Sequence, residues 1–255
     1  MTGDGRTTTA PPAPSGGAVV TLFGERALLA ARFAEHLATT GVERGLIGPR
    51  EVPRLWDRHV LNCAVVAPLL GHGDRCVDVG SGAGLPGLAL AIARPDVDIT
   101  LVEPLQRRVL WLEEVVADLG LTRVEVVRAR AEELHASGPR FEVATARAVA
   151  ALDKLAGWCL PLVVPGGRLL ALKGRSAAEE LAAASGALDR LGARGRSIVE
   201  CGAGVVEEPT TVVVVEAGEP VRKGSGKGRG SGAGRSGGAS SGRPPRTGRR
   251  GDRRD

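Results

Sequence analysis

The stretch CVDVGSGAGLPGLALAIARPDVDITLVEP, residues 76–104, decides the fold. It contains a short apolar strand, CVDVG, then a glycine-rich turn, a helix from Leu85 to Ala93 and a second strand, ITLVE. Short apolar runs that alternate with helical segments are typical of parallel sheets covered on both faces. Glycines at such a junction let the backbone approach a ligand beside the free N–H groups of the first helical turn. The stretch therefore predicts a ligand site in an α/β fold.

The same alternation continues to residue 191. A helix is expected at 106–119, a short one after VEVVRA, and further helices at 154–160 and 176–191 after the runs FEVATARAV and RLLALKG. The last two runs, RSIVECGA and TTVVVVEAG, have no helix between them, which predicts an antiparallel hairpin. This order is similar to the Rossmann-like class I S-adenosylmethionine-dependent methyltransferase fold with its seven-stranded sheet. A dinucleotide-binding fold would instead add another helical crossover.

The segment before the sheet is predicted to be helical. Apolar residues recur at helical spacing in VVTLFGERALLAARFAEHLATTG, which we expect to be one helix ending at Gly41, and again from about Pro49 to Gly71. Together they form a predicted N-terminal helical cap, residues 18–73, ahead of a methyltransferase domain at 74–218. Residues 1–17 are of low complexity and are expected to be disordered.

The net charge of +5 is divided unevenly along the 255 residues. Residues 218–255 hold 11 Lys or Arg against 3 Asp or Glu, a net charge of +8, which leaves −3 for the rest of the chain. The Gly- and Arg-rich tail at 219–255 has too few apolar side chains to offset its ordering entropy, so we expect it to be disordered. Such an arm attracts polyanions without sequence specificity, although a solubilising role fits the composition equally well.

Composition also argues against several classes of protein. No run of eighteen apolar residues could span a bilayer, and the N-terminus lacks the order of a secretory signal, so we expect a cytoplasmic protein without a membrane partner. The four cysteines lie far apart and form no C-x-x-C pair, which argues against disulfides and against a metal site. The sequence contains no heptad repeat, and we expect a monomer.

The glycines of DVGSGAGLPG fit two classes of cofactor. Gly82, Gly84 and Gly87 satisfy the dinucleotide pattern G-x-G-x-x-G, which is a weak signal by itself. Glu103 ends the second strand 19 residues beyond Gly84, where its carboxylate can accept hydrogen bonds from a ribose diol. The alternative for Glu103 is an ordinary strand terminus. Both features suit NAD and S-adenosylmethionine alike.

Three features favour S-adenosylmethionine over NAD. Asp78 lies two residues before Gly80, where a carboxylate would meet a methionine ammonium group and repel a pyrophosphate; the alternative is that it caps a loop. Ala131 and Glu132 fall where such folds contact the adenine edge, although Glu132 and Glu133 also suit a solvated helix start. The chain has no tyrosine, and it lacks a second domain in which to build a hydride-transfer site.

Six motifs in order, RHVLN, DVGSGAGLPG, LVEP, RAEEL, TARAVA and LALKG, resemble the small-subunit ribosomal RNA guanine-N7 methyltransferase family, also called glucose-inhibited division protein B. The resemblance covers residues 45–218. It implies transfer of a methyl group from S-adenosylmethionine to N7 of guanine 527 in 16S ribosomal RNA, as naked RNA or within the small ribosomal subunit. The donor contacts that it implies are Gly80, Leu85, Ala131, Glu132 and Arg147.

The chain departs from this family at two places. Family members often carry Asn-Leu-Thr ahead of the Arg-His pair, where this chain has Gly45, Leu46 and Ile47. The long basic tail is additional to the family's core. Both departures concern the way in which RNA is held rather than the donor site.

Guanine N7 carries an in-plane lone pair and no proton, so it can attack the methyl group without a general base. We therefore assign no catalytic side chain. The enzyme has to align N7, the methyl carbon and the sulfur, and to accept a guanine that is unstacked or single-stranded.

Arg58, His59, Arg147 and Lys173 are the candidates for holding RNA. Arg147 and Lys173 end the fourth and fifth strands, at the edge where ligands bind in open α/β sheets, and the alternative for each is a structural salt bridge. His59 either points over the cleft or packs between helices. The three tryptophans lie at core spacing on apolar helices, so we expect them in the core rather than stacked on a base.

Other functions stay open at this point. A small-molecule methyltransferase would need a substrate cap that encloses a metabolite, and the sequence shows none. A non-catalytic RNA-binding or assembly protein, which the tail suggests, would tolerate degraded glycines or the loss of Glu103, and both are intact. An NAD-dependent oxidoreductase is a more distant alternative.

Overall fold

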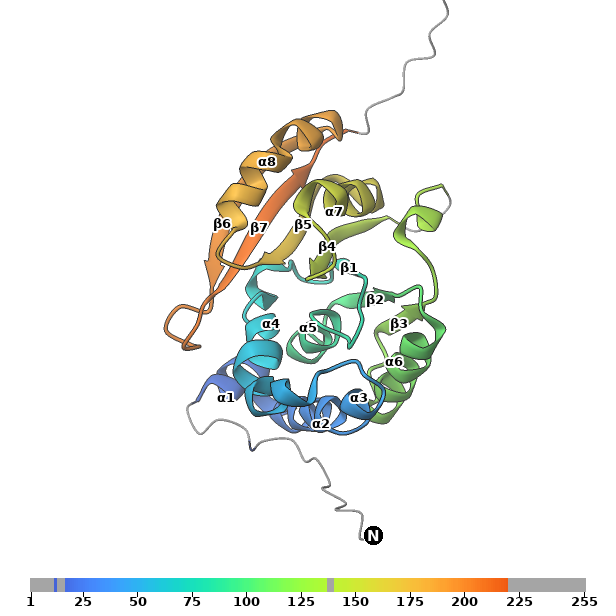
Figure 1. The fold of residues 1–255 in the computed structure, drawn as a ribbon, viewed down its shortest axis with the longest axis vertical. Helices are drawn as coiled ribbons and strands as arrows, with labels where there is room; N and C mark the ends of the chain where they lie inside the picture. The colour runs from blue at the N-terminus through green and yellow to red at the C-terminus, as the bar shows by residue number, and fades with distance from the viewer. Residues whose placement is uncertain (1–11, 13–16, 137–139, 220–255) are drawn as a thin grey trace, which may run out of the picture. The chain divides into compact units, whose positions relative to one another are not determined.

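The computed structural model describes residue 12 and residues 17–136 and 140–219 of the chain. The segments expected to be disordered, 1–17 and 219–255, fall almost entirely outside the described residues. The described residues form a sheet with helices on both of its faces (Figure 1).

Seven strands form a single mixed sheet in the order β3-β2-β1-β4-β5-β7-β6. Strands β1 to β5 are parallel, and β7 runs antiparallel to its two neighbours, β5 and β6. This topology confirms the predicted fold with its C-terminal antiparallel hairpin. The strands are β1 Arg75–Val79, β2 Asp98–Val102, β3 Val124–Val127, β4 Phe141–Arg147, β5 Val163–Lys173, β6 Ala193–Cys201 and β7 Thr210–Ala217.

The strand order creates a switch point at the carboxyl ends of β1 and β4. The chain moves outward from β1 through β2 to β3, and then returns to place β4 on the other side of β1. Ligands of open α/β sheets bind in the crevice that such a reversal leaves. The N–H of Gly80 donates to the Val102 carbonyl at 2.8 Å, and the N–H of Glu103 donates to the Val127 carbonyl at 3.1 Å. These bonds hold the glycine loop and the end of β2 beside this crevice.

Side chains alternate along each strand and fill two separate cores. In β1, Cys76 packs in the core that contains α5 and α6, and Val77 packs in the core that contains α7 and α8. The sequence predicted the four main helices to within two residues at each end. The helices after β1 are α5 Gly87–Ala93, α6 Gln106–Leu119, η5 Ala131–Leu134, α7 Leu152–Cys159, η6 Leu160–Leu162 and α8 Ala177–Arg190.

The N-terminal cap is more broken than predicted. Gly24 interrupts its first helix, because a φ of +50° lies outside the helical region. Pro53 interrupts the second predicted helix, because proline has no N–H to donate to the carbonyl one turn earlier in an α-helix. The first half consists of α1 Ala18–Phe23, η1 Gly24–Arg26, α2 Ala27–Ala38 and α3 Thr40–Glu43. The second half consists of η2 Pro49–Arg54, the π-helix η3 Leu55–Leu61, α4 Asn62–Ala64 and η4 Ala67–Leu69.

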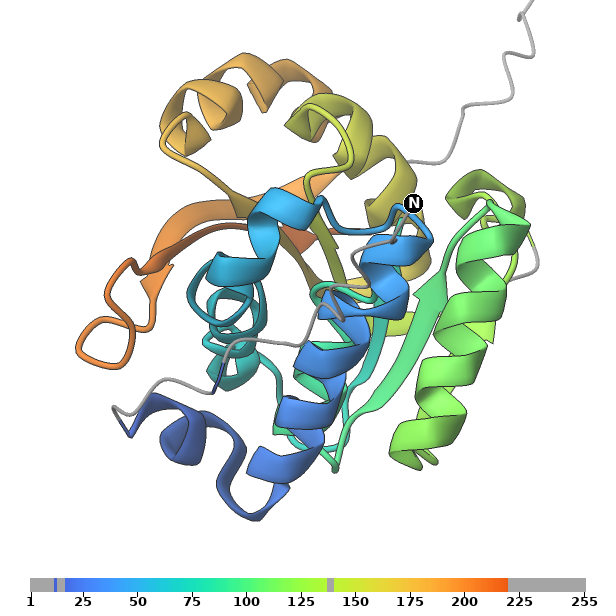
Figure 2. The ribbon, with the colours of Figure 1, turned by 60° about the horizontal axis from the view of Figure 1, so that its bottom comes forward.

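The cap and the sheet share one hydrophobic core. Phe33 and Leu37 of α2 are fully buried together with Trp111 and Leu112 of α6. The indole N–H of Trp111 donates to Oγ1 of Thr40 at 2.9 Å. Helix α2 packs beside α6, on the same face of the sheet (Figure 2). The four cysteines are buried free thiols.

Candidate functional site

The glycine loop after β1 depends on glycine for its shape. The φ angle is +74° at Gly80 and +75° at Gly84, a region that L side chains rarely adopt. Gly84 is also tightly packed, since a Cβ there would lie 2.4 Å from Cδ1 of Leu88. A side chain at Gly84 would therefore strain the backbone and displace the side chain of Leu88 in the first turn of α5.

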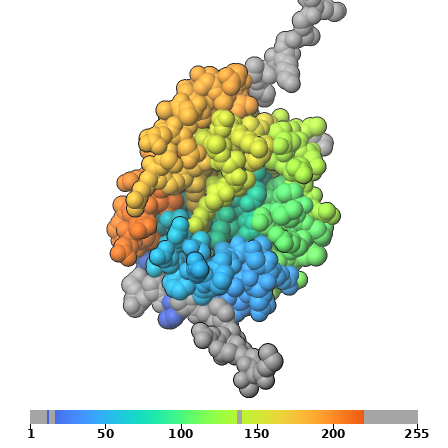
Figure 3. All heavy atoms as spheres, in the orientation of Figure 1, coloured from blue at the N-terminus to red at the C-terminus, as the bar shows by residue number. Residues whose placement is uncertain are grey.

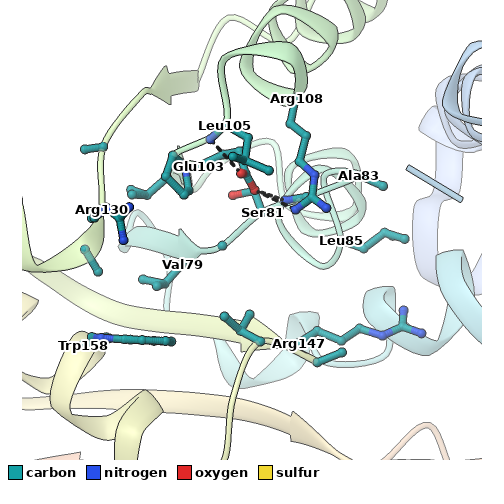
Figure 4. A pocket seen from close by; sticks show the side chains of 18 of the residues that line it. Val79, Ser81, Ala83, Leu85, Glu103, Leu105, Arg108, Arg130, Arg147 and Trp158 are labelled. Carbon is teal, nitrogen blue, oxygen red and sulfur yellow. Dashed lines mark hydrogen bonds and ion pairs between the residues drawn. The ribbon is translucent and has the colours of Figure 1, made fainter. Parts of the chain in front are cut away.

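Glu103 ties the glycine loop to the end of β2. Its buried carboxylate accepts one hydrogen bond from the Gly82 N–H to Oε2 and one from the Leu105 N–H to Oε1, both at 3.0 Å. Nη1 of Arg108 lies 3.5 Å from Oε2 (Figure 4). Oε1, whose one partner among the described residues is the Leu105 N–H, keeps a further lone pair for a ligand hydroxyl.

Asp78 lies beneath the glycine loop rather than on a cavity wall. Its Oδ2 accepts a hydrogen bond from the Gly87 N–H at 3.1 Å, and its Oδ1 has no hydrogen-bond partner among the described residues. Strand alternation directs this side chain toward α5, so the structure fits the loop-capping alternative. Burial raises the pKa of Asp78 to about 7.

A cavity of about 1120 Å³ opens at the switch point, between the glycine loop, the ends of β2, β3 and β4, η5, α7 and the cap. In Figure 3 the teal atoms of the central strands are visible at the bottom of a hollow between the blue cap and the green and yellow segments. The volume is sufficient for a nucleoside-sized ligand. All predicted donor-site residues except Asp78 line it, namely Gly80, Gly82, Leu85, Glu103, Ala131, Glu132 and Arg147.

The two acids of η5 have different surroundings. The carboxylate of Glu133 accepts a hydrogen bond from the N–H of Arg130 at 2.9 Å, which is the contact of a capped helix start. Glu132 is exposed and lines the cavity next to the buried Ala131. The predicted alternative of an acid at a helix start thus applies to Glu133, whereas the side chain of Glu132 stays available to a ligand.

Trp158 lines the cavity, whereas the sequence predicted it in the core. The core positions of α7 are Leu152, Leu155, Ala156 and Cys159, and Trp158 falls beside this stripe. Its ring is half-buried, and Nζ of Lys154 lies 5.0 Å from the ring centroid. The sequence spacing already indicates this position, because Trp158 does not share the helical spacing of the four core residues. The other two tryptophans, Trp56 and Trp111, are buried as predicted.

The guanidinium of Arg147 is turned toward the cap. It donates to the Arg58 carbonyl at 2.8 Å, to Sγ of Cys63 at 3.1 Å and to Nδ1 of His59 at 3.2 Å. Figure 4 shows this side chain extending away from Glu103 and Trp158. Arg147 therefore lines the cavity while its charged end holds the cap.

His59 links Arg147 to Glu51. Arginine can only donate, so Nδ1 of His59 accepts from Arg147, and Nε2–H donates to Oε2 of Glu51 at 2.9 Å. Burial lowers the pKa of His59, and the charge of Arg147 lowers it further, against the opposing effect of Glu51. The imidazole is thus neutral, with both nitrogens engaged, at the edge of the cavity.

The remaining two candidates lie outside the cavity lining. Arg58 is 57% exposed, with its Nε 3.7 Å from Oε2 of Glu51. Lys173 is only 9% exposed, and its ammonium lies 2.7 Å from Oε2 of Glu180 and donates to the Ala150 carbonyl at 2.8 Å. The salt-bridge alternative therefore describes Lys173 in this structure.

Across residues 17–136 and 140–219, no helix combines the length and the apolar character needed to cross a membrane.

Curated proteins that share one name are similar to this chain over most of its length. Ribosomal RNA small subunit methyltransferase G of Salinispora tropica is 57% identical over 217 residues, which cover 83% of this chain and 90% of that protein. The protein of the same name from Renibacterium salmoninarum is 59% identical over 202 residues, 79% of this chain and 94% of its own length. A solved structure of an rRNA methylase from Streptococcus thermophilus aligns at 16% identity with a TM-score of 0.44, over 62% of this chain and 94% of that one.

Residues 27–209 match the family model described as rRNA small subunit methyltransferase G. The match spans most of the chain, and the first two relatives align over nearly their whole length. The chain therefore belongs to the rRNA small subunit methyltransferase G family, whose methyl donor is S-adenosylmethionine.

Proposed function

We propose that this chain transfers a methyl group from S-adenosylmethionine to N7 of a single guanine, guanine 527, in 16S ribosomal RNA. Family membership supports small-subunit ribosomal RNA as the substrate, and the motif resemblance supports the atom and the position. The observation that carries the proposal is the cavity at the switch point, in which the Glu103 carboxylate faces the ligand space and four arginines contribute to the walls.

We infer one orientation for the donor in this cavity. Glu103 is suited to the ribose hydroxyls, because its Oε1 keeps a free lone pair. Ala131, Glu132 and the ring of Trp158 offer a mainly apolar wall for adenine. The methionine part then runs along Gly80 and Leu85. When bound, the donor supplies a methyl group on a positively charged sulfur.

N7 suits this cavity as the acceptor, because the imidazole of His59 at its edge has no nitrogen free to take a proton. Both ring nitrogens of His59 already hold hydrogen bonds within the protein. A hydroxyl or amino acceptor would have to lose a proton, whereas N7 has none to lose. The residues around Gly80 therefore need only align the guanine with the methyl group and exclude water.

RNA phosphates would be attracted by the rim of the cavity. Arg128 and Arg130 are exposed there, and Arg108 is half-exposed. Arg58 adds a positive charge on the side of the cap. The basic tail, which lies outside the described residues, would extend this attraction without sequence specificity. Because the substrate is ribosomal RNA, we infer that the enzyme acts in the cytoplasm, and we propose that it does so as a monomer.

Transfer of a labelled methyl group to small ribosomal subunits from a strain that lacks this gene tests the proposal. N7-methylguanosine should be the labelled nucleoside, and Glu103→Ala should abolish labelling at limiting donor. Label in a different nucleoside would refute the N7 assignment. Donor binding without transfer to any RNA would favour a small-molecule methyltransferase, or a non-catalytic RNA-binding protein if RNA is bound as well.

A further inference from the structure

The segment 148–151, which joins β4 to α7, is fixed at both ends by basic side chains. At its start, Arg147 is held by the cap. Near its end, the Lys173 ammonium donates to the carbonyl of Ala150 at 2.8 Å. Nζ of Lys173 also lies 2.7 Å from Oε2 of Glu180, so Lys173 connects the segment to helix α8.

Glu180 completes this arrangement. Its pKa is lowered by Lys173, and the Ser176 hydroxyl and the backbone of Leu152 lower it further. Ser176 donates to Oε1 of Glu180 at 3.2 Å. Leu152 begins α7 directly after the segment, so Glu180 lies beside the end of the segment that Lys173 holds through the Ala150 carbonyl. We call Lys173 and Glu180 the clamp.

The clamped segment has an unusual backbone and an exposed apolar side chain. Ala148 has φ +54°, and among the described residues it is the one non-glycine residue with positive φ. Such a conformation persists only where the surroundings hold it, and it is frequent at functional sites. Val149 follows, 37% exposed, and lines the cavity. A Cβ placed on Gly80 would lie 3.0 and 3.1 Å from the Val149 methyl groups, so Val149 lies directly on the glycine loop.

We propose that the clamp positions Val149 as the apolar support for the acceptor guanine, and that Lys173 acts through Ala150 rather than by contacting RNA. The inference rests on the proposed function, because it needs a base to enter beside Gly80. Lys173 is 9% exposed and already has a carboxylate and a carbonyl as partners, which leaves its charge poorly placed for a phosphate. Lys173 and Glu180 are thus positioning residues.

Two single variants separate the clamp from an RNA contact. Lys173→Met and Glu180→Gln should each lower kcat on small subunits by roughly 10-fold to 100-fold at saturating donor, because small misplacements of a reacting group are costly. KM for the subunit and its salt dependence should stay unchanged. The double variant should be no slower than Lys173→Met, since both changes break one unit. A phosphate contact would instead raise KM in Lys173→Met, reduce the salt slope by about one, and leave Glu180→Gln active.

Arg175→Met is the matched control. Arg175 is exposed two residues beyond Lys173, so the variant removes the same charge at the same edge of the sheet without touching the segment. Its kcat should equal that of the wild type. Affinity for S-adenosylhomocysteine and the melting temperature should be similar in all four variants, which excludes general misfolding as the cause.

A second measurement is independent of activity. Amide hydrogen exchange in residues 148–151 should be faster in both Lys173→Met and Glu180→Gln than in the wild type and in Arg175→Met. Unchanged exchange in these residues would overturn the clamp, whatever the enzyme methylates. If the wild type transfers no methyl group to RNA but residues 148–151 exchange faster in the two variants, the proposed function and the guanine support are overturned. The clamp itself is then still established.

Discussion

Nη2 of Arg147 donates a hydrogen bond to Nδ1 of His59 across 3.2 Å, and this contact joins the end of β4 to the π-helix of the cap. Sequence position made both side chains candidates for holding RNA, with an internal structural role as the alternative. The structure shows instead that each is a partner of the other, with Glu51 and Cys63 as the next contacts. The cap is therefore fixed at the edge of the cavity by a partly buried chain of polar contacts.

Arg147→Lys should loosen the cap. A lysine has a single ammonium group and cannot donate at once to Cys63, His59 and the Arg58 carbonyl. We expect the free energy of unfolding to fall by about 1–3 kcal/mol, the usual cost of unsatisfied buried partners. Cys63, which is fully buried, should be alkylated faster, as followed by mass spectrometry of its peptide. An unchanged alkylation rate would contradict the role of Arg147 as a tie to the cap.

Glu103→Gln should weaken donor binding. Glutamine replaces one acceptor oxygen by an amino group, which then faces the N–H of either Gly82 or Leu105. The dissociation constant for S-adenosylhomocysteine, measured by calorimetry, should rise about 10-fold to 100-fold, because hydrogen bonds to a charged group are worth about 1.5–3 kcal/mol. Glu113→Gln is the control, since Glu113 is exposed on α6 and lies outside the cavity lining. Equal effects of the two variants would show that Glu103 has no special place in the donor site.

Trp158 should report on the adenine end of the donor. Trp56 and Trp111 are buried in the core, so a fluorescence change on adding adenosine should come from Trp158 and should be absent in Trp158→Phe. Trp158→Leu should weaken S-adenosylhomocysteine binding by up to about 10-fold, the range of an aromatic contact. Free methionine should cause no fluorescence change. A response to adenosine that persists in Trp158→Phe would place the purine elsewhere.

Asp78→Asn should change how stability depends on pH. Burial raises the pKa of Asp78 to about 7, whereas an aspartate in an unfolded chain has a pKa of about 3.9. Between these values the folded protein keeps a proton that the unfolded chain releases, so Asp78 makes the free energy of unfolding fall as pH rises from about 4 to about 7. The neutral asparagine lacks this effect.

Urea unfolding at several pH values measures the contribution of Asp78 by difference. The variant should gain stability relative to the wild type by up to about 1.4 kcal/mol per pH unit across this range, and the difference should level off above pH 7. Stability curves that stay parallel from pH 5 to pH 8 would show that Asp78 is ionised throughout.

The sheet and the position of Glu103 could be predicted because both depend on local patterns. Alternation of apolar runs sets the strands, and the distance from Gly84 to the end of the next strand sets Glu103. Gly24 and Pro53 could also have indicated the breaks in the cap, since glycine and proline interrupt helices for local reasons.

The partners of the charged side chains could not be predicted. Arg147 and Lys173 end strands at the expected edge, but their contacts come from the π-helix and from α8, which are distant in sequence. Asp78 faces α5 because of strand alternation and the path of the glycine loop, and its spacing alone does not show this. Which carboxylate or carbonyl a cation meets depends on tertiary packing, so sequence reasoning left contact with RNA and internal pairing as alternatives.

The central claim is that one guanine of 16S ribosomal RNA receives the methyl group at N7. Methylation at N7 makes a guanosine sensitive to borohydride reduction and aniline cleavage, which maps the modified position directly. RNA from subunits treated with the wild-type protein and S-adenosylmethionine should be cut once, at guanine 527, and RNA treated with Gly80→Asp should stay intact. Incorporation of label without cleavage, or a cut at another guanine, would contradict the account.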